Sequence, residues 1–295
     1  QDPKRKTDKA LLATAYLYHD ARLMARYATS LGKTNDARYF NNLAEQLKAA
    51  FNQKFFRADA GQYDNGSQTS CVLPLAFGLV PDGERRRVFD HLVKKITDET
   101  HRHIGTGLIG AQYLMRVLTE GGRADLAYTI ATQKTYPSCG YMVEKGATTI
   151  WELWNGDTAD PAMNSGNHVM LVGDLCIWFY ENLAGIKADP DQPGFKHIIM
   201  RPEPVGDLRF VKASHRSPYG LIVSDWQRQS GVFRWNITVP VNTTATVYLP
   251  AKSADGITER GKSALSAPGV RFLRLEQGRA VFELGSGHFS FQSPE

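Results

Sequence analysis

The sequence lacks paired cysteines, long hydrophobic runs and dense blocks of charge. Its 295 residues include only three cysteines, and Cys71, Cys139 and Cys176 form neither a CxxC pair nor the His/Cys spacing of a zinc site. We therefore expect three buried free thiols and no metal site. No apolar run has the length of a membrane span, so no membrane contact is expected. The polar start 1–6 has no apolar signal segment, which leaves the compartment open.

The sequence also gives no indication that the chain binds a nucleic acid or a nucleotide. The net charge is +5, and its densest runs, Lys4–Lys6 and Arg85–Arg87, are short and lack interleaved aromatic residues. A nucleic-acid partner is therefore not expected. The chain contains no phosphate-binding loop, no dinucleotide fingerprint and no GxSxG motif, so we expect neither a nucleotide cofactor nor a serine nucleophile. No cofactor of any kind is expected.

What the first part of the chain does contain is helical periodicity. Gly32 is expected to end the first helix as its C′ residue, and Thr34–Asp36 to cap the second. Antiparallel helices with short loops indicate a bundle, a solenoid or an α/α barrel. Polar loops that all fall between helices favour the barrel, because such loops converge on one end. The predicted helices span residues 8–30, 34–55, 67–79, 84–100, 108–120, 123–133 and 165–183.

The pattern of apolar and polar residues changes after Gly185. The run 189–194 is rich in Pro, Asp and Gly, which is typical of a linker. Short alternating segments beyond it predict an all-β sandwich, with Trp226 and Trp235 in its core. We therefore expect two domains, helical over 1–187 and all-β over 188–295. The predicted strands span residues 197–200, 208–214, 220–229, 231–239, 244–249, 270–276 and 279–284.

One stretch, residues 140–154, gathers carboxylates and aromatic side chains. Its composition predicts a hairpin with a turn at Lys145-Gly146. Alternation on the second strand would place Glu152 and Trp154 on one face, and Trp151 on the other. A carboxylate beside an indole suits a sugar, because the ring stacks on the indole while the carboxylate handles a proton or a water. The alternative is an amphipathic strand whose Glu152 only faces solvent.

A histidine follows in a polar context. His168 comes directly after the polar residues 164–167, at the expected start of a helix. It is either a local hydrogen-bonding residue or part of the same pocket as Glu152. We further expect Trp154 to line that pocket and Trp151 to pack into the protein.

Several long motifs resemble one known family. These are LAFGLVP at 75–81, TYPSCGYM at 135–142, GATTIWELW at 146–154, MNSGNH at 163–168 and GFKHIIMRPEPVGDL at 194–208. Together they resemble the inverting α-L-rhamnosidases of glycoside hydrolase family 78, over nearly the whole chain. The resemblance implies part of an (α/α)6 barrel, or α/α toroid, followed by an all-β sandwich. It also implies a rhamnose-containing oligosaccharide, polysaccharide or glycoside as substrate.

The resemblance also implies roles for individual residues. Glu152 corresponds to the general base that activates water, and His168 to a histidine that contacts the sugar. The other candidates for substrate binding lie in the same motifs and are Trp154, Trp151, Tyr141 and Asn167. An inverting mechanism also needs a second carboxyl group, with space for water between the two.

Two departures from the family are visible. Cys139 stands where the family commonly has an aromatic residue, so one wall of the sugar pocket is expected to be thinner. The acidic motif that carries the family's general acid is absent before Glu152. We therefore expect the C-terminal part of a rhamnosidase, inactive by itself and prone to self-association. If the acid is in this chain, the first candidates are Asp59, Asp64, Glu144 and Asp157.

Two other functions remain open on the sequence. The chain could be a carbohydrate-binding or scaffold module in which the β-sandwich is the functional part. It could also be an (α/α)6 glycosidase that acts on a different sugar.

Overall fold

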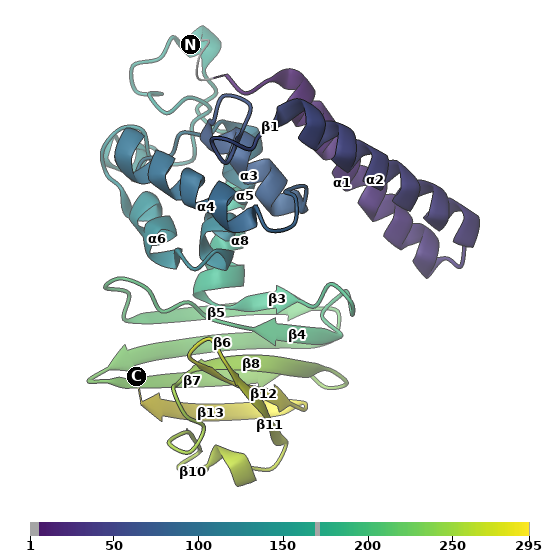
Figure 1. The fold of residues 1–295 in the computed structure, drawn as a ribbon. Helices are drawn as coiled ribbons and strands as arrows, with labels where there is room; N and C mark the ends of the chain where they lie inside the picture. The colour runs from purple at the N-terminus through teal and green to yellow at the C-terminus, as the bar shows by residue number, and fades with distance from the viewer. Residues whose placement is uncertain (1–5, 169–171, 295) are drawn as a thin grey trace. The chain divides into compact units, whose positions relative to one another are not determined.

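A computed structural model describes residues 6–168 and 172–294 and divides the chain into two compact units. The division falls between Leu175 and Cys176. The first unit is helical and the second is built from strands (Figure 1). The expected order of a helical part followed by an all-β part is therefore confirmed.

The first unit consists of helices with short connections. Its helices are α1 (Lys9–Ser30), α2 (Thr34–Phe55), α3 (Gln68–Phe77), α4 (Arg85–Lys94), α5 (Leu108–Glu120), α6 (Ala124–Thr132), α7 (Cys139–Glu144) and the first part of α8 (Val172–Trp178). A π-helical turn, η2 (Lys95–Glu99), continues α4, and the two-residue strands β1 (Phe56–Arg57) and β2 (Gln62–Tyr63) pair with each other. The helices α1 and α2 lie side by side as an antiparallel pair (Figure 1), and α5 packs against both α3 and α6.

Local capping explains several helix ends. Asp8 accepts a hydrogen bond from the Ala10 amide at the start of α1. At its end, the Gly32 and Lys33 amides donate to Thr29 and Ala28, with Gly32 at φ +69°, which confirms the predicted C′ glycine. The predicted cap of α2 is wrong: Thr34 is already helical, and Lys33 precedes it without a side-chain bond.

The segment 140–154 does not form the predicted hairpin. Residues 139–144 are helix α7, and 147–154, all within the described chain, contain no strand. Ser138 caps α7 by accepting from the Tyr141 amide at 2.9 Å. At the other end, the Gly146 amide donates to Val143 and the Ala147 amide to Met142, with Gly146 at φ +82°. A helix closed at both ends in this way outweighs the β propensity of its residues.

The last predicted helix, over 165–183, is only partly helical. Residues 165–168 are irregular, and 169–171 lie outside the described residues. Helix α8 is described from Val172, and the π-helical segment η5 (Phe179–Leu183) follows it. His168 therefore belongs to an irregular segment.

The second unit is a sandwich of two sheets. One sheet has the strand order β10-β9-β13-β7-β6-β5, and the other has β11-β12-β8-β4-β3. Strand β4 runs parallel to β8, and the other pairings are antiparallel. The strands are β3 (Ile186–Ala188), β4 (His197–Met200), β5 (Phe210–Ser217), β6 (Gly220–Gln229), β7 (Val232–Val239), β8 (Thr244–Pro250), β9 (Thr258–Glu259), β10 (Lys262–Ser263), β11 (Val270–Glu276), β12 (Arg279–Leu284) and β13 (Gly287–Pro294).

The core between the two sheets contains the expected tryptophans. Trp226 and Trp235 are fully buried, and their indole N–H groups donate to the Leu183 carbonyl and the Ser224 hydroxyl. The run 189–194, expected as a linker, connects β3 and β4, which pair with each other. It is therefore a loop within one sheet.

The three cysteines are free, but only Cys71 is buried, since Cys139 is half-buried and Cys176 is exposed. The expectation of three buried thiols was therefore wrong for Cys176. Among the residues that the structure describes, no helix is both long enough and apolar enough to cross a bilayer.

Candidate active site

Two irregular segments of the helical unit, 149–153 and 164–168, pair in antiparallel fashion. The Glu152 amide donates to the Ser165 carbonyl at 2.9 Å, and the His168 amide donates to the Ile150 carbonyl at 2.7 Å. Two asparagine side chains reinforce the pairing. The Asn164 Oδ1 accepts from the Leu153 amide at 3.1 Å, and the Asn167 Oδ1 accepts from the Thr149 hydroxyl at 3.0 Å. Asn167 therefore helps to hold the two segments together.

This pairing places Glu152 and His168 next to each other. The Glu152 Oε2 accepts a hydrogen bond from the Ser165 amide at 3.1 Å and lies 4.0 Å from His168 Nδ1. The Glu152 side chain is 43% exposed and the His168 side chain 18% exposed. A carboxylate in this position is oriented by the backbone, faces an imidazole and remains accessible to water. It could accept a proton from a water molecule or from a sugar hydroxyl.

Tyr141, on helix α7, binds a different carboxylate. Its hydroxyl donates to the two oxygens of Asp157 at 3.0 and 2.9 Å. Loss of solvent contact, together with this carboxylate, raises the pKa of Tyr141. Lys145 Nζ lies 4.0 Å from the Asp157 carboxylate, and the Tyr136 ring meets the Tyr141 ring edge-on at 5.6 Å. The Asp157 carboxylate is thus already engaged by a hydroxyl and an ammonium group.

The other acidic candidates also have local partners. Glu144, the last residue of α7, pairs with Lys134 at 2.8 Å, which lowers the pKa of Glu144. Asp64 accepts from the Asp8 amide at 3.3 Å, next to the start of α1. Asp59 lies in the loop between β1 and β2, where its carbonyl accepts from Arg87.

The two tryptophans cannot be assigned to opposite strand faces, because no strand is present there. Both are half-buried. Trp151 packs against Gly156, where an added Cβ would lie 2.6 Å from the indole ring. Trp154 lines a small cavity instead. The geometric reason for the expected difference was therefore wrong, although the two indoles do have different surroundings.

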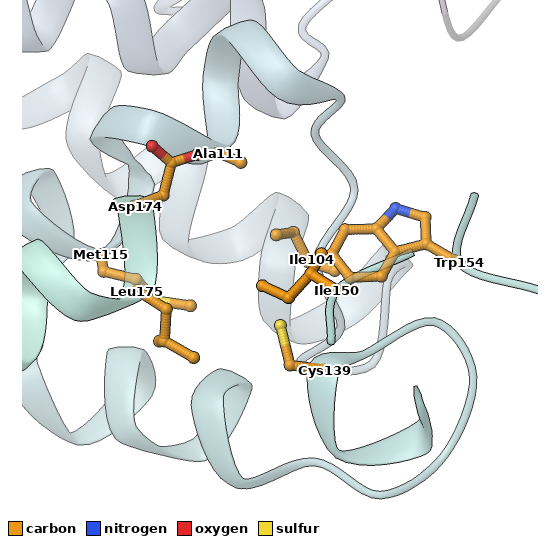
Figure 2. A pocket seen from close by; sticks show the side chains of 8 residues that line it. All are labelled: Ile104, Ala111, Met115, Cys139, Ile150, Trp154, Asp174 and Leu175. Carbon is orange, nitrogen blue, oxygen red and sulfur yellow. The ribbon is translucent and has the colours of Figure 1, made fainter. Parts of the chain in front are cut away.

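That cavity has a volume of about 40 Å³ and a mostly apolar lining (Figure 2). Trp154 and Ile150 belong to the segment that carries Glu152, and Cys139 belongs to α7. Figure 2 shows Trp154, Ile150, Ile104 and Cys139 grouped on one side, with Asp174 on the other. The lining residues are Ile104, Ala111, Met115, Cys139, Ile150, Trp154, Asp174 and Leu175.

Asp174, on α8, is a carboxyl group that the sequence analysis missed. Its Oδ2 is buried and has no hydrogen-bond partner among the residues that the structure describes. Burial raises its pKa to about 6, although the positive charge of Arg116 acts in the opposite direction. Burial also raises the pKa of the Cys139 thiol, with a further contribution from Asp174. The available signal was a single acidic residue within the apolar sequence Leu171–Trp178, which reads LVGDLCIW.

Within the described part of the chain, no three His, Cys, Asp or Glu side chains converge as a metal site would require. The local chemistry of the paired segments is that of a carboxylate, an imidazole and amide groups.

Two family models match the chain. The bacterial α-L-rhamnosidase 6-hairpin glycosidase domain matches residues 1–183, and the bacterial α-L-rhamnosidase C-terminal domain matches residues 185–264. Among curated proteins, an α-L-rhamnosidase of Streptomyces avermitilis is 38% identical over 291 residues, which are 97% of this chain and 27% of that protein. One from Formosa agariphila is 32% identical and matches 98% of this chain and 31% of its own length.

Solved structures are similar as well. The S. avermitilis α-L-rhamnosidase complexed with L-rhamnose superposes with a TM-score of 0.89 at 37% identity, over 97% of this chain and 27% of the other. The α-L-rhamnosidase of Dictyoglumus thermophilum superposes with a TM-score of 0.87 at 36% identity, over 95% of this chain and 31% of the other. The chain thus spans less than a third of the length of these relatives.

Proposed function

Since the chain belongs to the bacterial α-L-rhamnosidase family, we propose that it is part of a glycoside hydrolase that removes terminal α-L-rhamnosyl residues with inversion. Two curated relatives at 38% and 32% identity are α-L-rhamnosidases, and one similar structure holds L-rhamnose. The substrate class is therefore a rhamnose-containing oligosaccharide, polysaccharide or glycoside. Because the chain spans 27% and 31% of these two relatives, the proposal concerns the protein in which the chain naturally occurs.

In this proposal, Glu152 is the general base. Its carboxylate takes a proton from a water molecule, and the water oxygen attacks the anomeric carbon on the face opposite the leaving group. The observation that carries the assignment is the position of Oε2, which is held by the Ser165 amide and lies 4.0 Å from His168 Nδ1. The side chain is 43% exposed, so a water molecule can reach the carboxylate.

The leaving oxygen must gain a proton from a second carboxyl group, which in inverting enzymes lies about 6.5–9.5 Å from the base. We propose that this general acid comes from outside the 295 residues. The carboxylates of Asp157 and Glu144 are engaged by Tyr141 and Lys134. Asp174 borders a mostly apolar cavity.

The remaining candidates would bind the sugar. We assign His168 to a sugar hydroxyl, because its ring lies beside the proposed base. Tyr141 and the two tryptophans would supply aromatic surface, and Asn167 would keep the paired segments in register. The β unit gives less support to a lectin-like function, since Trp226 and Trp235 are fully buried and cannot stack on a ligand.

The test is Glu152→Gln in the naturally occurring protein, with an aryl α-L-rhamnoside as substrate. We expect kcat to fall by about 10²- to 10⁴-fold or more, because general base catalysis is lost while the side chain keeps its size. Glu144→Gln is the matched control, since it makes the same change in a neighbouring glutamate that is paired with Lys134. If Glu152→Gln hydrolyses the substrate at nearly the wild-type rate while Glu144→Gln is inactive, the base is Glu144 instead.

A further inference from the structure

Glu152 is held by backbone hydrogen bonds on both sides of its Cα atom. Its own amide donates to the Ser165 carbonyl at 2.9 Å, and the Leu153 amide donates to Asn164 Oδ1 at 3.1 Å. We propose that Asn164 is a positioning residue for the proposed base and keeps the Glu152 carboxylate in one orientation. This inference rests on the proposed function, and it assigns a residue that acts through Glu152 rather than on the sugar.

The segment that carries Glu152 needs such support because it has no regular secondary structure. Residues 150–154 are neither helical nor part of a strand, so no repeating ladder of backbone hydrogen bonds holds them. Amides that are shielded from water in such a segment need acceptors of their own. For the Leu153 amide, the acceptor is the Asn164 side chain, and this hydrogen bond is partly buried.

The two hydrogen bonds fix the peptide groups that flank the Glu152 Cα atom. The Glu152 amide belongs to the preceding peptide group, and the Leu153 amide lies in the same plane as the Glu152 carbonyl. When both planes are fixed, the direction of the Cα–Cβ bond of Glu152 is fixed as well. If Asn164 loses its side-chain oxygen, the peptide group that follows Glu152 loses its acceptor and is free to rotate.

This direction determines which carboxylate oxygen of Glu152 is available to water. Oε2 accepts a hydrogen bond from the Ser165 amide at 3.1 Å and lies 4.0 Å from His168 Nδ1. Among the residues that the structure describes, none makes a hydrogen bond or an ion pair with Oε1. Oε1 is therefore the atom that takes the proton of the attacking water, while Oε2 keeps its bond to the backbone. A displacement of about 1 Å in such a geometry can cost about 10²-fold in rate.

The other asparagine of the paired segments has a different partner. Asn167 Oδ1 accepts from the Thr149 hydroxyl at 3.0 Å, and this hydrogen bond is exposed and joins two side chains. The Asn164 bond is partly buried and reaches the backbone amide that directly follows Glu152. Of these two asparagines, Asn164 therefore has the more direct influence on the orientation of the carboxylate.

The experiment measures kcat and KM for an aryl α-L-rhamnoside in the naturally occurring protein. Asn164→Ala removes the acceptor and should lower kcat by about 10- to 10²-fold, while KM stays close to the wild-type value because the contacts to the bound sugar are kept. Asn236→Ala is the matched control. It removes the same acceptor from an exposed asparagine of the β unit, where Oδ1 accepts from the Ser290 hydroxyl at 2.9 Å, and it should leave both constants unchanged.

Asn164→Asp separates positioning from a general structural role. Its carboxylate can still accept the hydrogen bond from the Leu153 amide, so kcat should recover to well above that of Asn164→Ala. Thermal unfolding shows whether each variant is folded. An Asn164→Asp protein that is as slow as Asn164→Ala overturns the inference. A folded Asn164→Ala protein with the wild-type kcat, or with a loss that appears in KM instead, overturns it as well.

A measurement on the wild-type protein applies even if Asn164→Ala does not fold. The Leu153 and Glu152 amides both donate to the segment 164–168, so hydrogen exchange should be slow at both. Exchange of the Leu153 amide as fast as in an unfolded chain overturns the inference and leaves the proposed function intact. A Glu152→Gln protein that hydrolyses the substrate at nearly the wild-type rate refutes the proposed role of Glu152 and this inference together.

Discussion

Asp174 combines a buried carboxyl oxygen with a raised pKa, and this has a consequence for stability. Its pKa rises from 3.8 to about 6, chiefly through burial. The folded chain therefore holds this proton more tightly than the unfolded chain does. The free energy of unfolding should fall as pH rises from about 4 to about 6, and the loss should persist at higher pH.

Asp174→Asn removes this effect. A pKa increase from 3.8 to about 6 costs about 3 kcal/mol for a fully buried group, and partial exposure reduces the expected cost to about 1 kcal/mol. The variant should therefore be more stable than wild type by about 1 kcal/mol at pH 7 and show little difference at pH 4. Urea unfolding at both pH values measures this, and Asp82→Asn, at an exposed aspartate, is the control. A stability gain for Asp174→Asn that is equal at both pH values would contradict the assigned pKa.

Single residues differ in how well the sequence predicts them. Motif resemblance was enough to select Glu152 and His168, and the structure places their side chains 4.0 Å apart. The hydrogen bond from the Ser165 amide to Glu152 depends on the path of the backbone, which spacing alone does not reveal. The burial of Asp174 depends on neighbours from other helices, so its local signal, a single acidic residue in the apolar run 171–178, does not by itself predict that burial.

At the level of elements, α7 is the clearest difference between expectation and structure. Its capping predicts the effect of two substitutions. Ser138→Ala removes the hydrogen bond to the Tyr141 amide and should cost about 1 kcal/mol of local stability. Gly146→Ala places a side chain at φ +82° and should cost about 1–2 kcal/mol.

Amide hydrogen exchange over residues 139–147 measures both effects, and each substitution should speed exchange there. Gly285→Ala is the control, because its φ is not positive and, apart from its two chain neighbours, no atom of the described residues lies within 4 Å of the added Cβ. If exchange over 139–147 is unchanged in both variants, the two caps do not stabilise α7.

The elements that were predicted correctly have strong local signals. The bounds of α5 and β6 agree with the sequence prediction to the residue. In contrast, β3 has three residues, which is too short for an alternating pattern. Strand β13 was missed although its signal exists, since Phe289 and Phe291 alternate with polar residues and are buried. The glycine and serine residues around the two phenylalanines hid that pattern.

At the level of the whole molecule, local patterns predicted the order of a helical and an all-β part, because helical and strand periodicities differ throughout the chain. They did not predict the strand order. Strand β4 pairs in parallel with β8, and β13 lies between β7 and β9. These pairings join segments that are distant in sequence, and their register depends on the packing of the two sheets against each other.

In the proposed function, Glu152 directs water to the anomeric carbon with inversion. Proton NMR can follow the hydrolysis of an aryl α-L-rhamnoside by the naturally occurring protein, before the released sugar equilibrates between its anomers. We predict that the β-anomer of L-rhamnose appears first and the α-anomer only later, and that Glu152→Gln releases neither at a comparable rate. Initial release of the α-anomer would mean retention and a nucleophilic carboxylate, and would contradict the assignment of Glu152 as a general base.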